Sequence, residues 1–285
     1  MNDKKIKITK MNGCGNDFVF LDMEEFQKAN LPIDVFVKKV CNRHTGIGAD
    51  GVIIPDIENT DDADIKWHYY NSDGTKAQMC GNGMRCFAKY VTDNGLVSKK
   101  TFTVKTDAGI ITPTMNDDGT VTVNMGKPVL EPKKIPFNAL NNLNQKILVK
   151  NREFVVNAVS MGNPHCIIYT EEDDLMTLAK TYGESIEYSS MFPEKTNVEF
   201  VKVKSRQEVD VGVWERGCGI TLACGTGACA VSVASILNNL TDSNVKVNLP
   251  GGTLNVKWQG NIDDTEYNVF MTGTCEYSFF AEYLL

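Results

Sequence analysis

Residues 65–83, IKWHYYNSDGTKAQMCGNG, align without a gap with residues 209–227, VDVGVWERGCGITLACGTG. Each stretch runs from an aromatic-containing strand pattern, through a polar residue nine positions before a cysteine, to the motif Cys-Gly-x-Gly. The cysteines are Cys80 and Cys224, and 224 − 80 = 144 gives the offset between the two copies. Similarity at a fixed offset indicates that the chain is built from a duplicated unit.

Two further pairs of segments recur in the same order at nearly the same offset. The segment ending at Asn16 resembles the one ending at Asn163, and the segment ending at Gly126 resembles the one ending at Gly273. Both offsets are 147, from 163 − 16 and 273 − 126. Chance could produce one such pair, but three in one order favour duplication.

Each half contains short strands with period-two alternation, separated by turns rich in Gly, Pro, Asn and Asp, and one prominent helix. The clearest strand patterns lie at 101–105, 120–124 and 244–249. Helices are expected at 83–93, 226–239 and 33–41, with a weaker one at 173–182. The helix at 226–239 is small and apolar nearly all round, which is typical of a helix enclosed by a sheet.

We therefore expect an α+β fold of two pseudo-symmetric units. Each unit should be a curled mixed β-sheet or barrel wrapped around a central helix. We assign residues 1–124 and 274–285 to an N-terminal unit that carries Cys80, and residues 125–273 to a C-terminal unit that carries Cys224. The alternation of polar and apolar residues alone does not decide whether the last dozen residues join the first unit.

Bulk composition excludes several classes of protein. The 285 residues are 42% hydrophobic and 23% charged, which is ordinary for a globular protein. The formal net charge of −7 argues against nucleic-acid or anionic-membrane partners. No apolar run reaches the ~18 residues of a membrane span, and the first residues lack a signal peptide's apolar core. Nine dispersed cysteines, an odd number, favour reduced thiols in a cytoplasmic protein.

A Cys-Gly-x-Gly motif at the start of a helix has a chemical use. The partial positive charge and unpaired N–H groups of a first helical turn lower thiol pKa values from about 8.5 to about 3.5–7.5. The same N–H groups bind anions, and glycines let the backbone approach a ligand closely. We expect Cys80 and Cys224 to show this effect and to lie on opposite faces of one carbon atom next to a carboxylate.

This arrangement favours inversion of an amino-acid α-carbon. One cysteine, as thiolate, would remove the α-proton, and the other, as thiol, would deliver a proton to the opposite face. Backbone N–H groups would stabilise the charge that spreads into the carboxylate. The two sulfurs should titrate as a coupled pair. The remaining seven cysteines are interpreted as packing or structural residues.

Cofactor and metal chemistry receive less support from the motifs. No Cys-x₂-Cys occurs, and the three histidines do not have metal-ligand spacing, so no metal is expected. Neither glycine-rich motif has the Lys-Ser/Thr of a P-loop or completes Gly-x-Gly-x-x-Gly. No lysine lies in an evident phosphate-binding context for pyridoxal phosphate. We therefore expect an enzyme that needs no cofactor.

The ordered motifs make this chain similar to the diaminopimelate epimerase family almost from end to end. Those in the first half are GCGNDF (13–18), RHTGIGAD (43–50), YNSDG (70–74) and MCGNGMRCF (79–87). Those in the second half are SMGNPHC (160–166), PEKTN (193–197), ERG (215–217), ACGTGAC (223–229) and LPGG (249–252). The resemblance implies cofactor-independent interconversion of LL- and meso-diaminopimelate in lysine and peptidoglycan synthesis, and a possible homodimer.

The resemblance also implies site residues. Cys80 and Cys224 would be the acid/base pair, with His165 and Glu215 beside them. The residues implied to hold a small diamino dicarboxylate substrate are Asn16, Asn71, Gly81, Asn82, Asn163, Asn197, Glu215, Arg216, Gly225 and Thr226. Two positions depart from the family pattern, Ile220 where a Glu is frequent and Gly51 where some members have Gln. Alternatives are a racemase or epimerase for another amino acid, such as histidine, and a non-catalytic thiol redox or binding protein.

Overall fold

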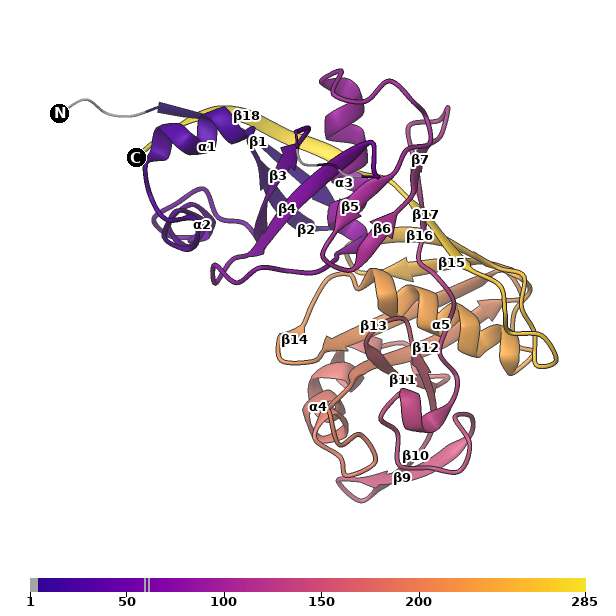
Figure 1. Ribbon diagram of the computed structural model, residues 1–285. Helices are drawn as coiled ribbons and strands as arrows, with labels where there is room; N and C mark the ends of the chain where they lie inside the picture. The colour runs from indigo at the N-terminus through magenta and orange to yellow at the C-terminus, as the bar shows by residue number, and fades with distance from the viewer. Residues whose placement is uncertain (1–4, 59, 61) are drawn as a thin grey trace. The chain divides into compact units, whose positions relative to one another are not determined.

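The computed structural model describes residues 5–58, 60 and 62–285, which form two compact units. One unit comprises the chain up to Val123 together with Gly273–Leu285, and the other comprises Asn124–Thr272. Each unit combines a mixed β-sheet with a few helices (Figure 1). The predicted α+β class is confirmed, and the recorded strand pairs in each unit run as an open path rather than a closed ring.

The first unit consists mostly of short strands that alternate with helices in the chain. Its elements are β1 (Lys5–Gly13), β2 (Asn16–Phe20), α1 (Met23–Ala29), α2 (Ile33–Cys41), β3 (Gly51–Asp56), β4 (Ile65–Asn71), α3 (Gly81–Asp93), β5 (Val104–Thr106), β6 (Gly109–Ile111), β7 (Pro113–Met115), β8 (Val121–Asn124) and β18 (Glu276–Leu284). The sheet order is β18-β1-β2-β3-β4-β5-β6.

The second unit has the same kind of composition. Its elements are the 3₁₀ helix η1 (Pro132–Lys134), β9 (Gln145–Val149), β10 (Arg152–Ser160), β11 (Pro164–Tyr169), α4 (Leu175–Glu187), β12 (Asn197–Ser205), β13 (Glu208–Glu215), β14 (Gly219–Ile220), α5 (Gly225–Leu237), β15 (Asn244–Leu249), β16 (Gly252–Trp258) and β17 (Val269–Gly273). Within this unit the sheet order is β17-β16-β15-β13-β12-β11-β10-β9.

The two sheets share one topology, which is the structural form of the duplication. The run β1-β2-β3-β4-β5-β6 alternates antiparallel and parallel pairs, beginning and ending with an antiparallel pair. The run β10-β11-β12-β13-β15-β16 repeats the same alternation. The parallel steps are crossovers that contain helices, α1–α2 and α3 in the first unit and α4 and α5 in the second. Strand β18 lies beside β1 as β9 lies beside β10.

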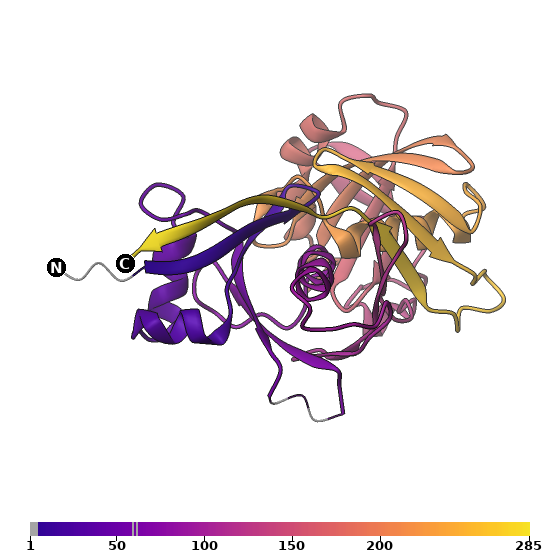
Figure 2. The same ribbon diagram turned by 90° about the horizontal axis from the view of Figure 1, so that it is seen from above.

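A central helix packs against the inner face of each sheet. In the first unit α3 contacts β1, β2, β3 and β7, and Figure 2 looks nearly along it with the strands curving around it. In the second unit α5 contacts β10, β11, β12, β15 and β16. Ten residues of α5 are buried, which explains why its sequence is apolar on every side. The helix prediction for this segment is therefore confirmed.

The outer face of each sheet is covered by the other helices. Phe36, Val37, Val40 and Cys41 lie on one face of α2 and join a buried cluster with β1, β2 and β3. Burial of each large side chain stabilises the fold by roughly 1.5–3 kcal/mol. Helix α4 forms the corresponding cluster with β9–β12. These two layers cover the outer faces of the sheets, whose inner faces pack against α3 and α5.

No helix among the residues that the structure describes is both long enough and apolar enough to cross a membrane.

Candidate active site

Cys80 is the N-cap residue of α3. Its backbone is extended (φ −145°, ψ 120°), and its sulfur accepts the N–H of Gly83 at 3.4 Å. A sulfur in this place satisfies one of the N–H groups that have no partner inside a helix. Gly83 leaves little room for a side chain, because a Cβ there would lie 3.2 Å from Cδ1 of Ile53 and 3.4 Å from Cζ of Phe18.

Asn16 connects Cys80 to a charged network. Its Oδ1 lies 3.4 Å from the sulfur of Cys80 and 3.4 Å from Nδ2 of Asn82, and its Nδ2 donates to Asp50 at 2.5 Å. Arg43 pairs with Asp50 and Asp17, each at 2.8 Å. This network fixes the orientation of the Asn16 amide. Asp17 and Asp50 were not expected among the site residues.

Three more residues of the first unit have informative surroundings, and the family resemblance implies two of them, Asn71 and Asn82. Asn71 ends β4 and donates from Nδ2 to Oγ1 of Thr75 at 3.1 Å. Asn82 is only 3% exposed, and its Oδ1 has no hydrogen-bond partner among the described residues. Tyr69 was not anticipated; burial, and then the nearby Cys80, raise the pKa of its hydroxyl. It is a buried donor beside the sulfur.

Gly51 occupies its position for a packing reason. A Cβ at this residue would lie 2.5 Å from the carbonyl oxygen of Tyr70 and 2.7 Å from Cε2 of Tyr69. A larger side chain therefore requires β3 and β4 to separate. The second departure from the family pattern, Ile220, lies on β14 and is 39% exposed.

Cys224 is the N-cap residue of α5 and repeats the geometry of Cys80. Its backbone is extended (φ −121°, ψ 112°), and its sulfur accepts the N–H of Gly227 at 3.3 Å and lies 3.4 Å from Oγ1 of Thr226. Burial raises the thiol pKa of Cys224, and the carboxylates of Glu215 and Glu199 raise it further. The Thr226 and Gly227 hydrogen bonds oppose this shift without overcoming it. The expected lowering of the pKa by the helix N-terminus is therefore wrong for Cys224, because a single helix end cannot offset full burial beside two carboxylates.

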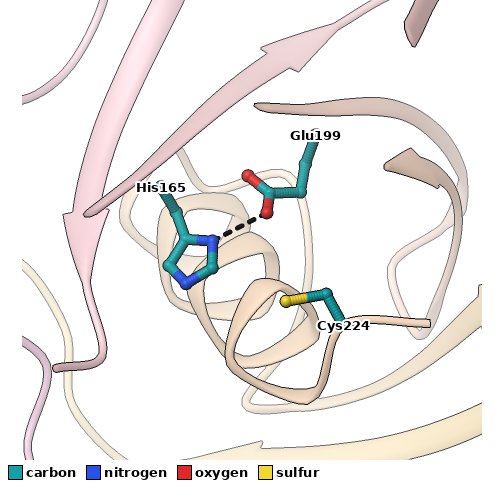
Figure 3. Close-up of side chains that lie close together, drawn as sticks. All are labelled: His165, Glu199 and Cys224. Carbon is teal, nitrogen blue, oxygen red and sulfur yellow. Dashed lines mark hydrogen bonds and ion pairs between the residues drawn. The ribbon is translucent and has the colours of Figure 1, made fainter. Parts of the chain in front are cut away.

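His165 and Glu199 form a buried pair next to Cys224. Both side chains are completely buried, and His165 Nδ1 lies 2.7 Å from Glu199 Oε1. His165 Nε2 lies 3.1 Å from Oδ1 of Asn163. Figure 3 shows the sulfur of Cys224 directed toward the pair, and one polar atom of each of the three residues lies within 4.8 Å of the others.

This cluster contains donor types that zinc uses. Two ligands of one ion at bond lengths of about 2.0–2.2 Å are normally more than about 3 Å apart in tetrahedral geometry. The 2.7 Å between His165 Nδ1 and Glu199 Oε1 is instead a hydrogen-bond distance. As arranged, His165 and Glu199 are hydrogen-bonded to each other rather than spaced as two ligands of one metal ion.

Glu215 ends β13, and Arg216 begins the loop that follows it. Glu215 accepts a hydrogen bond from Thr221 at 2.5 Å, and burial raises the pKa of its carboxyl. Asn197 is buried and uses both ends of its amide on the backbone, donating to Pro164 O and accepting from Arg216 N, each at 2.9 Å. Asn197 therefore holds the Arg216 loop in place. The exposed Arg216 side chain donates to Glu194 O at 3.1 Å.

Glu187 also shapes this loop, although no sequence motif pointed to it. Its two carboxylate oxygens accept the Trp214 indole N–H at 2.7 Å and the Gly217 N–H at 3.0 Å. Among the thirteen implied residues, Cys80 and Cys224 cap α3 and α5, and Gly81, Asn82, Gly225 and Thr226 lie in the first turns of these helices. Asn16 lies beside Cys80, and His165, with Asn163 bonded to it, lies next to Cys224. Glu215, Arg216 and Asn197 meet at the end of β13, whereas Asn71 ends β4 with Thr75 as its recorded partner.

Comparison with known proteins agrees with these features. The family model "Diaminopimelate epimerase" matches residues 8–131, which include Cys80, and residues 157–278, which include Cys224. The chain belongs to the diaminopimelate epimerase family. A diaminopimelate epimerase of Halothermothrix orenii is 42% identical over 280 residues, 95% of each chain. One of Desulforapulum autotrophicum is 44% identical over 283 residues, 96% of this chain and 98% of the relative.

Solved structures show the same fold at low sequence identity. A hydroxyproline epimerase from Agrobacterium vitis has a TM-score of 0.69 at 13% identity and covers 99% of this chain and 93% of its own. A Bacillus anthracis phenazine biosynthesis protein of the PhzF family has a TM-score of 0.68 at 14% identity, with coverage of 99% and 100%. These likenesses confirm the fold that was expected for the family.

Proposed function

We propose that the protein interconverts LL- and meso-diaminopimelate by a two-base mechanism without a cofactor. Membership of the family supports the substrate. The observation that carries the mechanism is the repetition of one device, a cysteine N-cap followed by Gly-x-Gly, at the same topological position of both units. One substrate α-carbon would be approached by both sulfurs.

The proton transfers balance as an exchange. The thiolate of one cysteine takes the α-proton, and the electron pair left on carbon spreads into the adjacent carboxylate. The other cysteine gives its S–H proton to the opposite face and becomes the thiolate. Because burial and two carboxylates favour the thiol form of Cys224, this residue suits the role of proton donor in one direction of the reaction.

The charge that develops on the substrate carboxylate needs fixed donors. The first-turn N–H groups of α3 and α5 supply them, as backbone donors aimed at developing charge do in other enzymes. On the same proposal, the buried Oδ1 of Asn82 accepts a substrate N–H, and Glu215 and Arg216 pair with an ammonium and a carboxylate respectively.

Deuterium exchange tests the proposal. The reduced protein is incubated in heavy water with LL-diaminopimelate and no pyridoxal phosphate, with L-histidine as a comparison substrate. The expected result is one deuterium at an α-carbon of diaminopimelate and formation of the meso isomer. Absence of exchange into diaminopimelate from a folded, reduced sample would contradict the proposed function. Exchange into histidine alone would show that the substrate is histidine instead.

We further propose a homodimer formed through β18. This strand ends the sheet path on one side, and Phe279 and Phe280 on it are 45% and 70% exposed. An uncovered edge strand with exposed aromatic residues favours pairing with a second copy. Sedimentation velocity should give a dimer for the native chain and a monomer for Phe280→Lys; a native monomer at micromolar concentration would refute the proposal.

The odd number of dispersed cysteines supports a reducing compartment, and we propose the cytoplasm. Fractionation of the source cells should recover the protein with cytoplasmic markers.

A further inference from the structure

Glu199 lies in a place where its twin in the other unit is apolar. The register pairs Phe18 with Gly51 and Phe20 with Ile53 in the first unit. In the second unit it pairs His165 with Asn197 and Ile167 with Glu199. His165 therefore corresponds to Phe18, and Glu199 corresponds to Ile53.

The glycines of the two motifs show that this is one packing position with two chemistries. A Cβ at Gly83 would meet Ile53 and Phe18, whereas a Cβ at Gly227 would lie 2.6 Å from Oε1 of Glu199. The first unit fills the space beneath its cysteine helix with hydrocarbon. The second fills it with a carboxylate and an imidazole that are both fully buried.

The stability of the fold does not explain why the second unit has a charged pair at this position. Removing a carboxylate from water costs free energy that a buried partner only partly returns, and apolar replacements of similar volume are frequently neutral or stabilising. One oxygen of Glu199, Oε2, has no hydrogen-bond partner among the residues described. The twin unit shows that the same topology packs well with an apolar pair.

The contacts of Glu199 indicate what it does instead. Its Oε1 lies 2.7 Å from Nδ1 of His165, and this hydrogen bond fixes the orientation of the imidazole ring. The titratable side chains near the Cys224 sulfur come from three strands: Glu199 from β12, His165 from β11 and Glu215 from β13. Cys80 has no counterpart of this pair, since Phe18 and Ile53 cannot carry charge.

We propose that Glu199 is a positioning residue that fixes the His165 ring beside Cys224 and keeps a negative charge near this sulfur. The inference rests on the proposed function, and it makes the two thiols of the pseudo-symmetric enzyme chemically unequal. In this role Glu199 needs no contact with the substrate. It acts on the proton held by Cys224.

The first test reads the thiol directly and needs no substrate. The rate of alkylation of Cys224 by iodoacetamide is followed against pH by mass spectrometry of its peptide, in the native chain and in Glu199→Gln. Loss of the charge should move the midpoint to lower pH by about one unit, because a like charge nearby disfavours the thiolate. Glu208→Gln is the matched control, since Glu208 lies on β13 in an exposed pair with Lys246. An unshifted or higher midpoint in Glu199→Gln would overturn the proposal.

The second test separates orientation from packing. Glu199→Ile should lower kcat about 10–100-fold, by analogy with the range found when a group that orients a metal-binding histidine is replaced. Glu199→Gln should lose less, because its amide oxygen still accepts the Nδ1–H. The double variant H165F/E199I copies the packing of the first unit, so it should remain folded with kcat as low as that of Glu199→Ile.

The outcomes distinguish this inference from the proposed function. If the native protein fails to epimerise diaminopimelate, the proposed function is refuted. The pH midpoint of Cys224 alkylation still decides whether Glu199 acts on this thiol. A folded Glu199→Ile variant with native kcat on an active enzyme overturns the positioning role.

Discussion

Gly227 and Glu199 are in such close contact that the carboxylate occupies the space of a missing side chain. A Cβ on Gly227 would lie 2.6 Å from Glu199 Oε1, closer than real Cβ atoms approach a neighbour. The equivalent Cβ on Gly83 would lie 3.2 Å from the terminal methyl of Ile53. The fourth residue of each Cys-Gly-x-Gly motif is therefore glycine for a different reason in each unit.

Gly227→Ala should destabilise the protein and Gly83→Ala should do so less. Overpacking costs about 1–3 kcal/mol, and a methyl group of Ile53 yields more easily than a carboxylate held by His165. Alanine also recovers up to about 1 kcal/mol of helix propensity at both positions. Urea denaturation of both variants measures the difference. Equal stability of the two would show that the Glu199 contact imposes no constraint on Gly227.

Asp50→Ala should lower kcat/KM without unfolding the protein. Asp50 holds Nδ2 of Asn16, whose Oδ1 lies beside the sulfur of Cys80. A small misplacement at a reacting centre can cost about 100-fold in rate. As a control, Asp107→Ala breaks only an exposed ion pair with Lys76 and should stay within about twofold of the native value. A native kcat/KM in Asp50→Ala would show that the hydrogen bond from Asn16 to Asp50 does not contribute to catalysis.

Acid should destabilise the first unit through Asp17. Burial raises the pKa of this carboxyl, but hydrogen bonds from Arg43 and Lys10 outweigh burial and hold it at about 2, below its ordinary 3.8. Because the folded value is the lower one, the stabilisation is complete above 3.8 and is lost as the pH falls toward 2. Asp17→Asn should therefore cost about 2 kcal/mol at pH 6 and almost nothing near pH 2. A pH-independent difference in denaturation midpoints would contradict this account.

Much of the fold could be predicted from sequence because its elements have clear periodicity. Helix α2 and strand β15 have the expected bounds, residues 33–41 and 244–249, since their apolar residues repeat with the helical and the strand period. Helix α3 begins at Gly81, two residues before the expected Gly83. Glycines are poor helix formers, so the sequence pattern does not reveal this first turn, which Cys80 caps. The short helix α1 was missed, although Asp22 accepts from the N–H of Glu25 as a typical N-cap.

Other features depend on contacts between distant residues. The pairing of β18 with β1 joins the two ends of the chain, and alternation in sequence cannot reveal such a partner. The pair of cysteines was legible because it lies in repeated motifs. Glu199 was missed because it follows no motif; the available signal was a lone carboxylate inside a strand whose first five residues are all buried.

The most direct test of the central claim is the turnover of LL-diaminopimelate by Cys80→Ala and Cys224→Ala, with Cys41→Ala as the control. Cys41 packs in the buried cluster around α2 and caps neither of the two helices. If each sulfur transfers a proton, either substitution at the helix starts should reduce kcat at least about 100-fold, within the range of a lost acid or base, while the control retains activity. Full turnover by either of the first two variants, folded and reduced, would contradict the two-cysteine mechanism.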